Sequence, residues 1–547
     1  MMSHGGIVCY RKAVIRKIVF FFELTPCTLL GRGLLGVQMQ GKTGSASQDN
    51  SSLGSRIRSV LSLQPDAVAI EGAGGKSTWA DLAAAAAHID AALRDAHVEH
   101  NTPVGWVAHN RSAAVAAFVS LVTTERMVVP LRPPQVSATL PEEITTQRLQ
   151  AVIADESDWA RQGVRDAAAA AGSLGIAITG WSPITVRVVA GCTRVGSGPH
   201  RLPAPGIVLE RLTSGTTGPP KRIPVNEAVL IPSLKAGEQS STDDGKELRI
   251  KRSPAILLKP FSHAGGLFGL LLALYQARPM VLLEKFSAEE WANVIRRYQP
   301  RSASLVPAMI RMILDANISP DALRSLRAVR AGTAPLDPQT QIEFESRFGI
   351  PILIDYGAAE FIGGVAGWTL EEHRQFAASK RGSVGRARGD VQLQVVSEET
   401  GEELARGRIG VLRVKSLRFG ADYFRTNDLA SIDGDGFLFL HGRADDAINR
   451  GGFKVLPEEV AAVLRRYAGV RDVAVIGMAD ARLGQVPIAA VEMMPGMNPP
   501  DPHELDAFVR AHLTGYMVPK EYRFVAALPR TASMKVSRPA LKAMLGV

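Results

Sequence analysis

Short apolar runs rich in β-branched residues alternate with longer stretches of helical periodicity through most of the chain. The first such unit is the run 68–72, followed by a Gly-containing turn and a helix that we expect to begin after Thr78. Asp81 stands three residues beyond Thr78 and completes a capping box. The same alternation continues through 104–131, 151–180 and 255–357. Alternating strands and helices predict a largely parallel sheet with helices on both faces.

The pattern changes twice toward the C-terminus. After Gly382, strand-like runs follow one another with Asp-Gly and Gly-Arg turns, which predicts a small antiparallel β region. After Gly442, helical and strand patterns form a unit of about a hundred residues. The fold class is therefore α/β: a large N-terminal domain of parallel α/β sheets plus a small antiparallel β region, then a small α+β C-terminal domain. The expected divisions are 1–52, 53–441 and 442–547.

Residues 1–52 are predicted to lie outside any domain. A basic pair and a short apolar run at 16–22 resemble the start of a secretory signal, but Glu23 interrupts the run. No apolar segment near 20 residues occurs in the chain, so no spanning helix is expected. Met39 precedes a polar, small-residue stretch, and we interpret it as the true start. A peripheral membrane anchor is the alternative.

The composition narrows the class of protein. A chain of 547 residues with 46% hydrophobic and 21% charged residues exceeds the size of one compact core. Its three cysteines, Cys9, Cys27 and Cys192, form no CxxC pair, so neither a disulfide framework nor a thiolate metal site is expected. A cytoplasmic location fits this usage best. The net charge of +10 is spread along the chain without a basic-aromatic stripe, so no nucleic-acid partner is expected.

The sharpest local signal is a loop rich in hydroxyl residues and glycine after the apolar run 207–210. Open backbone N–H groups, side-chain donors and one lysine are what a phosphate-holding loop needs. The glycine spacing differs from that of a Walker A loop. A flexible turn is the alternative interpretation. The predicted phosphate contacts are Thr213, Ser214, Gly215, Thr216, Thr217, Gly218 and Lys221.

Six motifs follow one another in a fixed order. They are TSGTTGPPK at 213–221, AGTAP at 331–335, DYGAAE at 355–360, YFRTND at 423–428, GRADD at 442–446 and PRTASMKVSR at 529–538. Together they resemble the motifs of the acyl-adenylate-forming superfamily, which contains acyl- and aryl-CoA synthetases, peptide-synthetase adenylation domains and firefly-type luciferases. The resemblance covers about residue 55 to the C-terminus, and six ordered motifs are far more specific than one.

The resemblance implies an ATP site and an adenylation chemistry. Lys535 would bridge the substrate carboxylate and the α-phosphate and stabilise the developing charge. Glu360 would be the Mg²⁺ ligand, a hard oxygen for a hard cation. Asp428 would bind the ribose hydroxyls, with Arg443 assisting. The adenine and α-phosphate contacts would come from Gly332, Thr333, Ala334, Asp355, Tyr356, Gly357 and Ala359. Each of these residues taken singly also has an ordinary structural explanation.

The same resemblance implies a hinge and a coenzyme A path. Asp445 occupies the hinge position, about which the small domain would rotate after pyrophosphate leaves. The loop at Gly451 and Gly452 would then replace Lys535 and let a pantetheine arm pass, since glycine has no Cβ in the way. Lys454 corresponds to a basic position that contacts phosphate. A simple turn before the strand at 453–456 is the alternative for the two glycines.

The acyl site is expected at PFSHAGGLFG, where His263 stands at the acyl-pocket position. Peptide-synthetase domains carry an acidic residue there that pairs with an amino group. Because this motif has no acid, a plain carboxylic acid is favoured over an amino acid. A packing role for His263 stays open. Plausible walls of the acyl pocket are Ala264, Phe268, Ala331 and Gly357.

We therefore expect a carboxylic acid–CoA ligase that uses ATP, Mg²⁺ and coenzyme A to convert a fatty or aromatic acid into its thioester through acyl-AMP. Two alternatives stay open: loading of an acyl carrier protein, and a non-catalytic adenylate-binding protein. Three departures from the motifs keep the second alternative open: Ala359 replaces a threonine, and Asn427 and Met534 replace glycines. The sequence does not distinguish a monomer from a homodimer.

Overall fold

The computed structural model describes residues 52–134, 140–212, 222–239, 248–358, 360–361, 363–531 and 533–547. The predicted phosphate loop at 213–221, the N-terminal extension through 51, and Ala359 lie outside the described residues. Within these ranges, no helix has the length and apolar character needed to cross a membrane.

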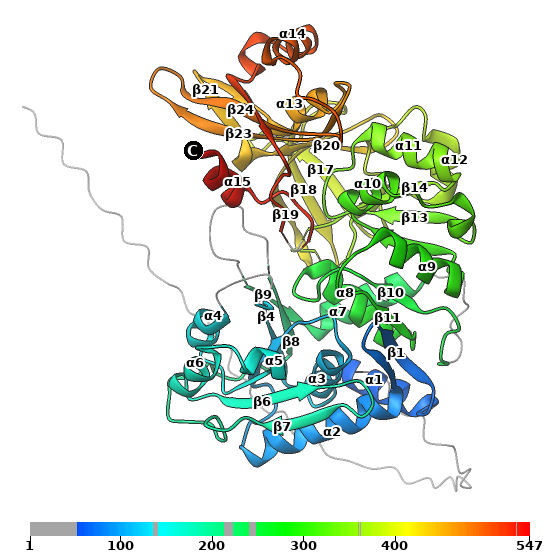
Figure 1. The fold of residues 1–547 in the computed structure, drawn as a ribbon, viewed down its shortest axis with the longest axis vertical. Coiled ribbons are helices and arrows are strands. Elements are labelled where there is room, and N and C mark those ends of the chain that lie inside the picture. The colour runs from blue at the N-terminus through cyan, green and yellow to red at the C-terminus, as the bar shows by residue number, and fades with distance from the viewer. Residues whose placement is uncertain are drawn as a thin grey trace, which may run out of the picture. The chain divides into compact units, whose positions relative to one another are not determined.

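The largest sheet has the strand order β7-β6-β5-β3-β4-β8-β9. Its strands β4, β6, β7, β8 and β9 are labelled in the lower part of Figure 1. Its central strands run parallel, and β7 and β9 join the edges antiparallel. The bounds are β3 Pro103–Val107, β4 Met127–Leu131, β5 Ala151–Asp155, β6 Leu174–Thr179, β7 Thr185–Val188, β8 Ile207–Leu212 and β9 Arg222–Asn226.

Alternate residues of these strands point to opposite faces of the sheet and contribute to two separate hydrophobic cores. Ile153 of β5 packs toward α2 (Trp79–Asp95) and α3 (Ser112–Thr123), whereas Val152 packs toward the opposite face. That opposite face is covered by α4 (Leu140–Gln147), α5 (Glu156–Trp159) and α6 (Val164–Ala170). Every residue of α3 is buried, which fits a helix that is apolar on all sides. Helices thus cover both faces, as the alternating pattern predicts.

A second sheet, β10-β11-β1-β2, shares the first core. Its strands are β1 Val68–Gly72, β2 Gly75–Thr78, β10 Ala255–Leu257 and β11 Met280–Leu282, and the helices α1 (Leu53–Leu63), α7 (Glu227–Gln239) and α8 (Ala264–Tyr275) contribute to the same core. The predicted capping box is present at the start of α2, where the Thr78 and Asp81 side chains each accept a backbone N–H from the other residue.

A third sheet, β12-β13-β14-β15-β16, carries two of the family motifs at its strand ends. The strands β12, β13 and β14 run parallel. The bounds are β12 Ser302–Leu305, β13 Ala328–Ala331, β14 Ile352–Tyr356, β15 Ala366–Gly367, β16 Arg386–Ala387, α9 Ala288–Tyr298, α10 Pro307–Asp315, α11 Pro338–Phe348 and α12 Leu370–Phe376.

The remaining two sheets are mainly antiparallel. The first, β17-β18-β19-β20, is fully antiparallel and consists of β17 Gln392–Val396, β18 Gly410–Ser416, β19 Gly420–Ile432 and β20 Leu438–Arg443. The C-terminal sheet is β22-β21-β24-β23, with β25 parallel to β24. Its elements are β21 Ile448–Arg450, β22 Phe453–Val455, α13 Pro457–Leu464, β23 Val470–Asp480, β24 Gly484–Met493, α14 Pro502–His512, β25 Glu521–Val525 and α15 Arg538–Leu545. The predicted fold class is confirmed, whereas the exact domain boundaries stay predictions.

Candidate active site

The loop that carries Lys535 folds back on itself between β25 and α15. Arg530 and Val536 form an isolated bridge, and the Thr531 N–H donates to the Lys535 carbonyl at 2.7 Å. Met534 adopts φ of 64°, the left-handed conformation that glycine takes without strain. Its side chain packs against the core formed by α9 to α11 and their sheet. The lysine loop is therefore docked against a part of the chain nearly two hundred residues earlier.

Lys535 lies near the predicted ribose and acyl residues. Burial lowers the pKa of its ammonium, Arg443 lowers this pKa further, and Asp428 opposes the shift. Burial, followed by the charges of Lys535 and Arg132, lowers the pKa of His263 to about 4. His263 is therefore neutral at neutral pH. Its Nε2 atom is buried without a hydrogen-bond partner among the described residues, so it is available to a ligand.

Tyr356 and Asp428 form the predicted nucleoside-binding pair. The buried Tyr356 hydroxyl donates to Asp428 Oδ2 across β14 and β19, and burial followed by the Asp428 charge raises the tyrosine pKa well above its usual value. Arg443 Nη1 lies 3.8 Å from Asp428 Oδ1, in register on β20. This arrangement leaves an oriented carboxylate beside an aromatic ring, which suits a ribose next to a base.

The loop after β13 approaches the end of β14 very closely. A β-carbon at position 332 would lie 2.7 Å from the Asp355 carbonyl oxygen, and one at position 357 would lie 2.8 Å from the Gly363 oxygen. Thr333 adopts φ of 74°, and Ala334 follows it in the same loop. A side chain at 332 or 357 would clash with these backbone oxygens, which explains why the motifs have glycine at both positions. The Asp355 carboxylate itself is held by two arginines, Arg330 and Arg388.

Glu360 is positioned through its backbone by Arg211, a residue that the sequence motifs do not mark. The buried Arg211 guanidinium donates to the carbonyls of Phe361, at 2.8 Å, and Glu360, at 3.3 Å. Burial lowers the pKa of Arg211 to about 10, and the Glu360 charge opposes this shift. Within the described residues, no group of three metal-ligating side chains is present. One carboxylate suits Mg²⁺ when substrate phosphates and water complete its shell.

Asp445, the predicted hinge residue, is held by the strand before it. Arg443 donates to its two oxygens at 2.9 and 2.8 Å, and the Asn427 amide donates at 3.2 Å. The Arg443 hydrogen bond, followed by its charge, lowers the pKa of Asp445. Asn427, one of the three departures from the motifs, therefore contacts the hinge directly.

The residues predicted for coenzyme A lie elsewhere. Gly451 and Gly452, with φ of 55° and 91°, form the two-residue turn between β21 and β22, where two positive φ values match the twist of a hairpin. Lys454 Nζ pairs with Glu398 at 2.7 Å. The contacts of the described residues therefore link Tyr356, Asp428, Arg443 and Lys535, whereas those of Gly451, Gly452 and Lys454 are with other residues.

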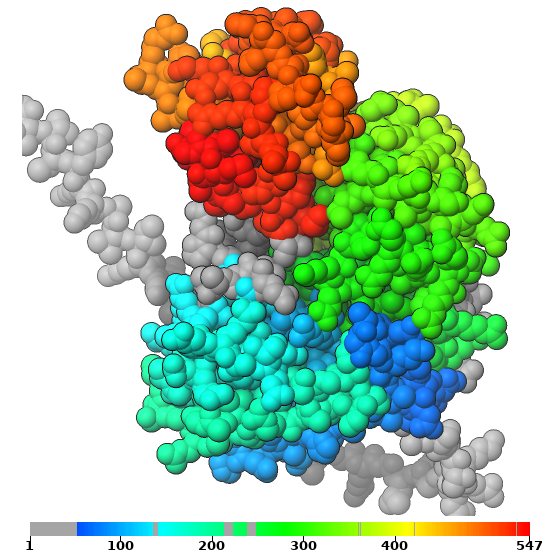
Figure 2. Space-filling model, viewed as in Figure 1, coloured from blue at the N-terminus to red at the C-terminus, as the bar shows by residue number. Residues whose placement is uncertain are grey.

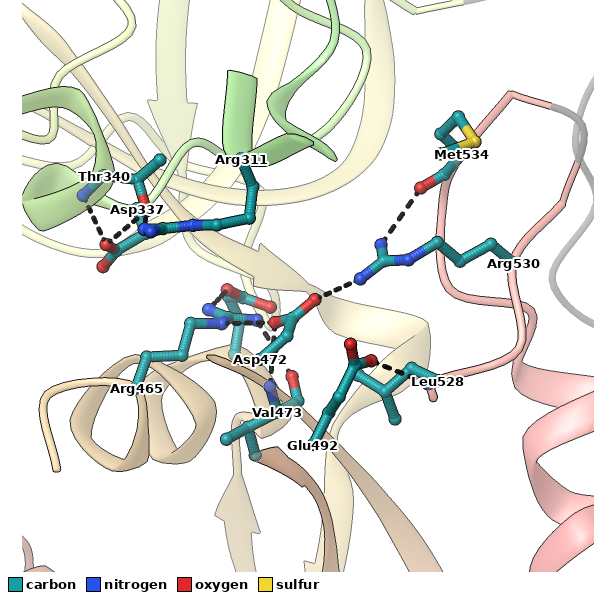
Figure 3. A network of polar contacts seen from close by, with 11 residues as sticks. Arg311, Asp337, Thr340, Arg465, Asp472, Val473, Glu492, Leu528, Arg530 and Met534 are labelled. Carbon is teal, nitrogen blue, oxygen red and sulfur yellow. Dashed lines mark hydrogen bonds and ion pairs between the residues drawn. The ribbon is translucent and has the colours of Figure 1, made fainter. Parts of the chain in front are cut away.

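The lysine loop is braced by a network that the sequence analysis missed. Arg530 donates to the Met534 carbonyl at 3.2 Å and to Asp472 at 2.6 Å (Figure 3). Asp472 also accepts from Arg465 at 2.9 Å, and Arg465 pairs with Glu458 at 2.6 Å. Arg530 lies inside the lysine motif, but its spacing gives no sign that its partner is on β23, some sixty residues earlier.

The C-terminal residues also contact the central part of the chain. Figure 2 shows the orange and red C-terminal surface against the green surface formed by residues near 300–350. One ion pair crosses this boundary: Arg471 Nη2 of β23 lies 2.6 Å from Asp315 Oδ2 at the end of α10.

Two family profiles match the chain. The AMP-binding enzyme profile matches residues 58–424, and the AMP-binding enzyme C-terminal domain profile matches residues 459–535. The first match alone covers more than half of the chain.

Individual relatives agree with these matches. A probable 2-succinylbenzoate–CoA ligase of Mycobacterium tuberculosis is 33% identical over 345 residues, 61% of this chain and 84% of that protein. An indoleacetate–CoA ligase of Aromatoleum aromaticum is 27% identical over 506 residues, 87% of this chain and 94% of that protein. Among solved structures, ATP-bound MatB from Rhodopseudomonas palustris has a TM-score of 0.75 and 24% identity, and the match covers 90% of this chain and 99% of that one.

Proposed function

Since this chain belongs to the AMP-binding enzyme family, the acyl-adenylate-forming superfamily that its motifs indicated, and is an AMP-forming acid–thiol ligase, we propose that it converts a carboxylic acid to its CoA thioester in two steps. The acid first attacks the α-phosphate of ATP and gives acyl-AMP and pyrophosphate. The thiol of coenzyme A then attacks the acyl carbon and releases AMP.

In the first step, Lys535 supplies the positive charge. Its ammonium bridges the attacking carboxylate and the α-phosphate, where negative charge builds in the transition state. The neutral ring of His263, with its unpartnered Nε2, donates to a substrate oxygen without adding charge. Asp428 accepts hydrogen bonds from the ribose hydroxyls, and the Tyr356 ring packs against the adenine. The loop at 213–221 wraps the β- and γ-phosphates.

Glu360 would hold a Mg²⁺ ion together with the substrate phosphates. When bound, such an ion neutralises charge on the phosphate oxygens and orients them. Arg211 fixes the backbone that carries Glu360, so the carboxylate is presented from a rigid position.

In the second step, the segment beyond Asp445 rotates and exchanges the lysine loop for the hairpin turn at Gly451 and Gly452. Support comes from the different contacts of the two residue sets, since Lys535 lies within electrostatic range of Asp428 and Gly451 and Gly452 form the turn of a hairpin. The matched names favour coenzyme A as the acceptor, and an acyl carrier protein is the second candidate. A fatty or aromatic acid is the substrate class that we propose, and the name of the indoleacetate–CoA ligase agrees with an aromatic acid.

The observation that carries this proposal is the convergence of Lys535, His263 and Asp428, residues from distant parts of the chain that lie within electrostatic range of one another. Lys535→Ala should lower the rate of ATP–pyrophosphate exchange by at least about 10²–10³, because it removes a charge needed in the transition state. Thioester formation from supplied acyl-AMP should continue at the wild-type rate. Lys542→Ala, which changes an exposed lysine of α15, is the matched control.

Wild-type exchange by Lys535→Ala would contradict the assignment of the lysine. Comparing free coenzyme A with a phosphopantetheinylated carrier protein as acceptor separates the two candidate ligases. Exchange without thioester formation from either acceptor would contradict the second step.

A further inference from the structure

A charged cluster lies at the carboxyl ends of the parallel strands β12, β13 and β14, beside the acyl motif. Its members are Lys259, Arg330, Asp355 and Arg388, and we call them the cationic cluster. Ser304 of β12 and Arg330 of β13 stand opposite each other in register, so their side chains share one face of the sheet. The Lys259 ammonium donates to Ser304 Oγ at 2.9 Å, which brings the lysine to the same face.

The stem of Lys259 runs past the start of α8, directly after the His263 turn. A β-carbon at position 265 would lie 3.6 Å from Lys259 Cδ and 3.7 Å from Thr333 Cγ2. Position 265 is two residues beyond His263 and belongs to the same motif. The cationic cluster is therefore the neighbour of the segments expected to wall the acyl group.

The charges of the cluster do not balance. Asp355 is already shared by Arg330, at 3.2 Å, and Arg388, at 2.9 Å. Among the described residues, no carboxylate forms an ion pair with Lys259, although Asp355 acts on it electrostatically. Three cations thus face Asp355, whereas Glu372 acts on Arg388 only electrostatically and forms its ion pair with Arg386. Burial lowers the pKa of both Lys259 and Arg388, which reflects the cost of holding these charges.

An anion that compensates the excess positive charge of the cluster can reach Lys259 from the solvent. The hydrogen bond between Lys259 and Ser304 is accessible to solvent, and Ser304 is exposed. A second carboxylate on the substrate could accept from the ammonium and from the hydroxyl at once. An ammonium group could not replace it, because the Asp355 charge is already matched by two guanidinium groups and Lys259 would repel a cation.

Resting on the proposed function, we infer that the acid activated by this enzyme is a dicarboxylic acid, whose distal carboxylate binds Lys259 and Ser304 while its other carboxylate is adenylated. An apolar acyl tail in this position would leave the cluster without its counter-charge. Lys259 is then a specificity-determining residue, and an unsubstituted fatty acid is a poor substrate.

The test compares acids of matched length and shape. Adipate is paired with hexanoate, and benzene-1,4-dicarboxylate with 4-methylbenzoate, in ATP–pyrophosphate exchange and in calorimetric binding of each acid to the full-length protein. We expect a dicarboxylate to exceed its partner in kcat/KM and in affinity by about ten- to a hundredfold, the usual range for a hydrogen bond to a charged group. Lys259→Met, which keeps the stem beside Gly265, should erase this preference.

Two further variants control for misfolding. Lys259→Arg keeps the charge and should retain the preference, and Lys285→Met removes an exposed lysine after β11 and should leave it unchanged. Equal or better use of the monocarboxylates by wild type, or an unchanged preference in a folded Lys259→Met, overturns the inference while leaving the proposed ligase intact. Dicarboxylate binding that needs Lys259 but supports no exchange with any acid supports the anion site and overturns the proposed function.

Discussion

The surroundings of His263 keep its ring neutral at neutral pH. Burial, followed by the charges of Lys535 and Arg132, lowers its pKa to about 4 from an ordinary value of 6.5. In the unfolded chain, the ring gains a proton as the pH falls through 6.5. In the folded protein it stays neutral until about pH 4, so the folded state loses stability across this interval as the pH falls.

This difference gives a prediction. Between pH 7.5 and pH 5, His263→Asn should lose less unfolding free energy than the wild type, by up to about 2 kcal/mol. Urea titrations at both pH values measure the difference. His503→Asn, at an exposed position of α14, should follow the wild-type curve. A parallel loss in His263→Asn and wild type would mean that the ring is not held neutral by the fold.

Single residues also show how far the sequence could predict the site. The sequence motifs predicted Tyr356, Asp428 and Lys535 as site residues. The structure brings these residues together, because the strands and the loop that carry them meet at one place. No sequence pattern marked Arg211 or Lys259 as a site residue, because each contacts a residue far away in the chain, Glu360 and Ser304 respectively. Spacing within a motif predicts local chemistry, but a partner on another element depends on tertiary packing.

At the scale of elements, the lysine loop needs support because it is strained. Met534 holds a left-handed conformation that costs a side-chain residue about 1–2 kcal/mol, and its packing against the core offsets part of that cost. Arg530 ties the loop to β23 through Asp472, which Arg465 also anchors (Figure 3). Arg530 is therefore a positioning residue for Lys535, acting through the backbone of Met534.

We predict that Arg530→Gln lowers kcat for ATP–pyrophosphate exchange about tenfold while KM for the acid changes little, because a charged hydrogen bond to the loop is lost. Thioester formation from supplied acyl-AMP should be unaffected. Arg530→Lys should recover part of the rate, since its ammonium can reach one of the two acceptors. Arg510→Gln, which breaks an exposed ion pair of α14, is the control. A loss confined to KM would argue that Arg530 acts on substrate binding instead.

The strand and helix pattern predicted the type of most elements but not their pairing. The run 68–72 was recognised as a strand, yet its parallel partner is β11, more than two hundred residues later. Strands buried on both faces have similar apolar sequences. The local sequence therefore does not show to which of the three sheets with parallel strands each strand belongs. Strand pairing in the antiparallel region after Gly382 was easier to predict, because Asp-Gly turns indicate that the strands on either side of them pair with each other.

At the scale of the whole molecule, the structure agrees with the first of the two states that the proposed mechanism requires. Lys535 is docked within electrostatic range of His263, and Gly451 and Gly452 form the turn of the β21–β22 hairpin. The predicted hinge residue Asp445 is held by Arg443 and by Asn427, two neighbours on the preceding strands. The ion pair between Arg471 and Asp315 spans the two regions that would have to separate. An exposed pair of this kind contributes little to stability, so it does not oppose separation.

The two-state mechanism predicts that a covalent link across this boundary blocks only the second half-reaction. In Asp315→Cys/Arg471→Cys, a short cleavable bismaleimide should join the two positions, since the native side chains meet at 2.6 Å. Exchange of pyrophosphate into ATP should continue, because Lys535 stays docked, whereas thioester formation should fall more than tenfold and return when the link is cleaved. Variants with only one of the two substitutions, treated in the same way, should keep both activities. Cys9 and Cys27 are replaced by serine in every variant, and Cys192 is buried and so poorly placed to react. Thioester formation at the unlinked rate by the linked protein would mean that the segment beyond Asp445 does not need to move.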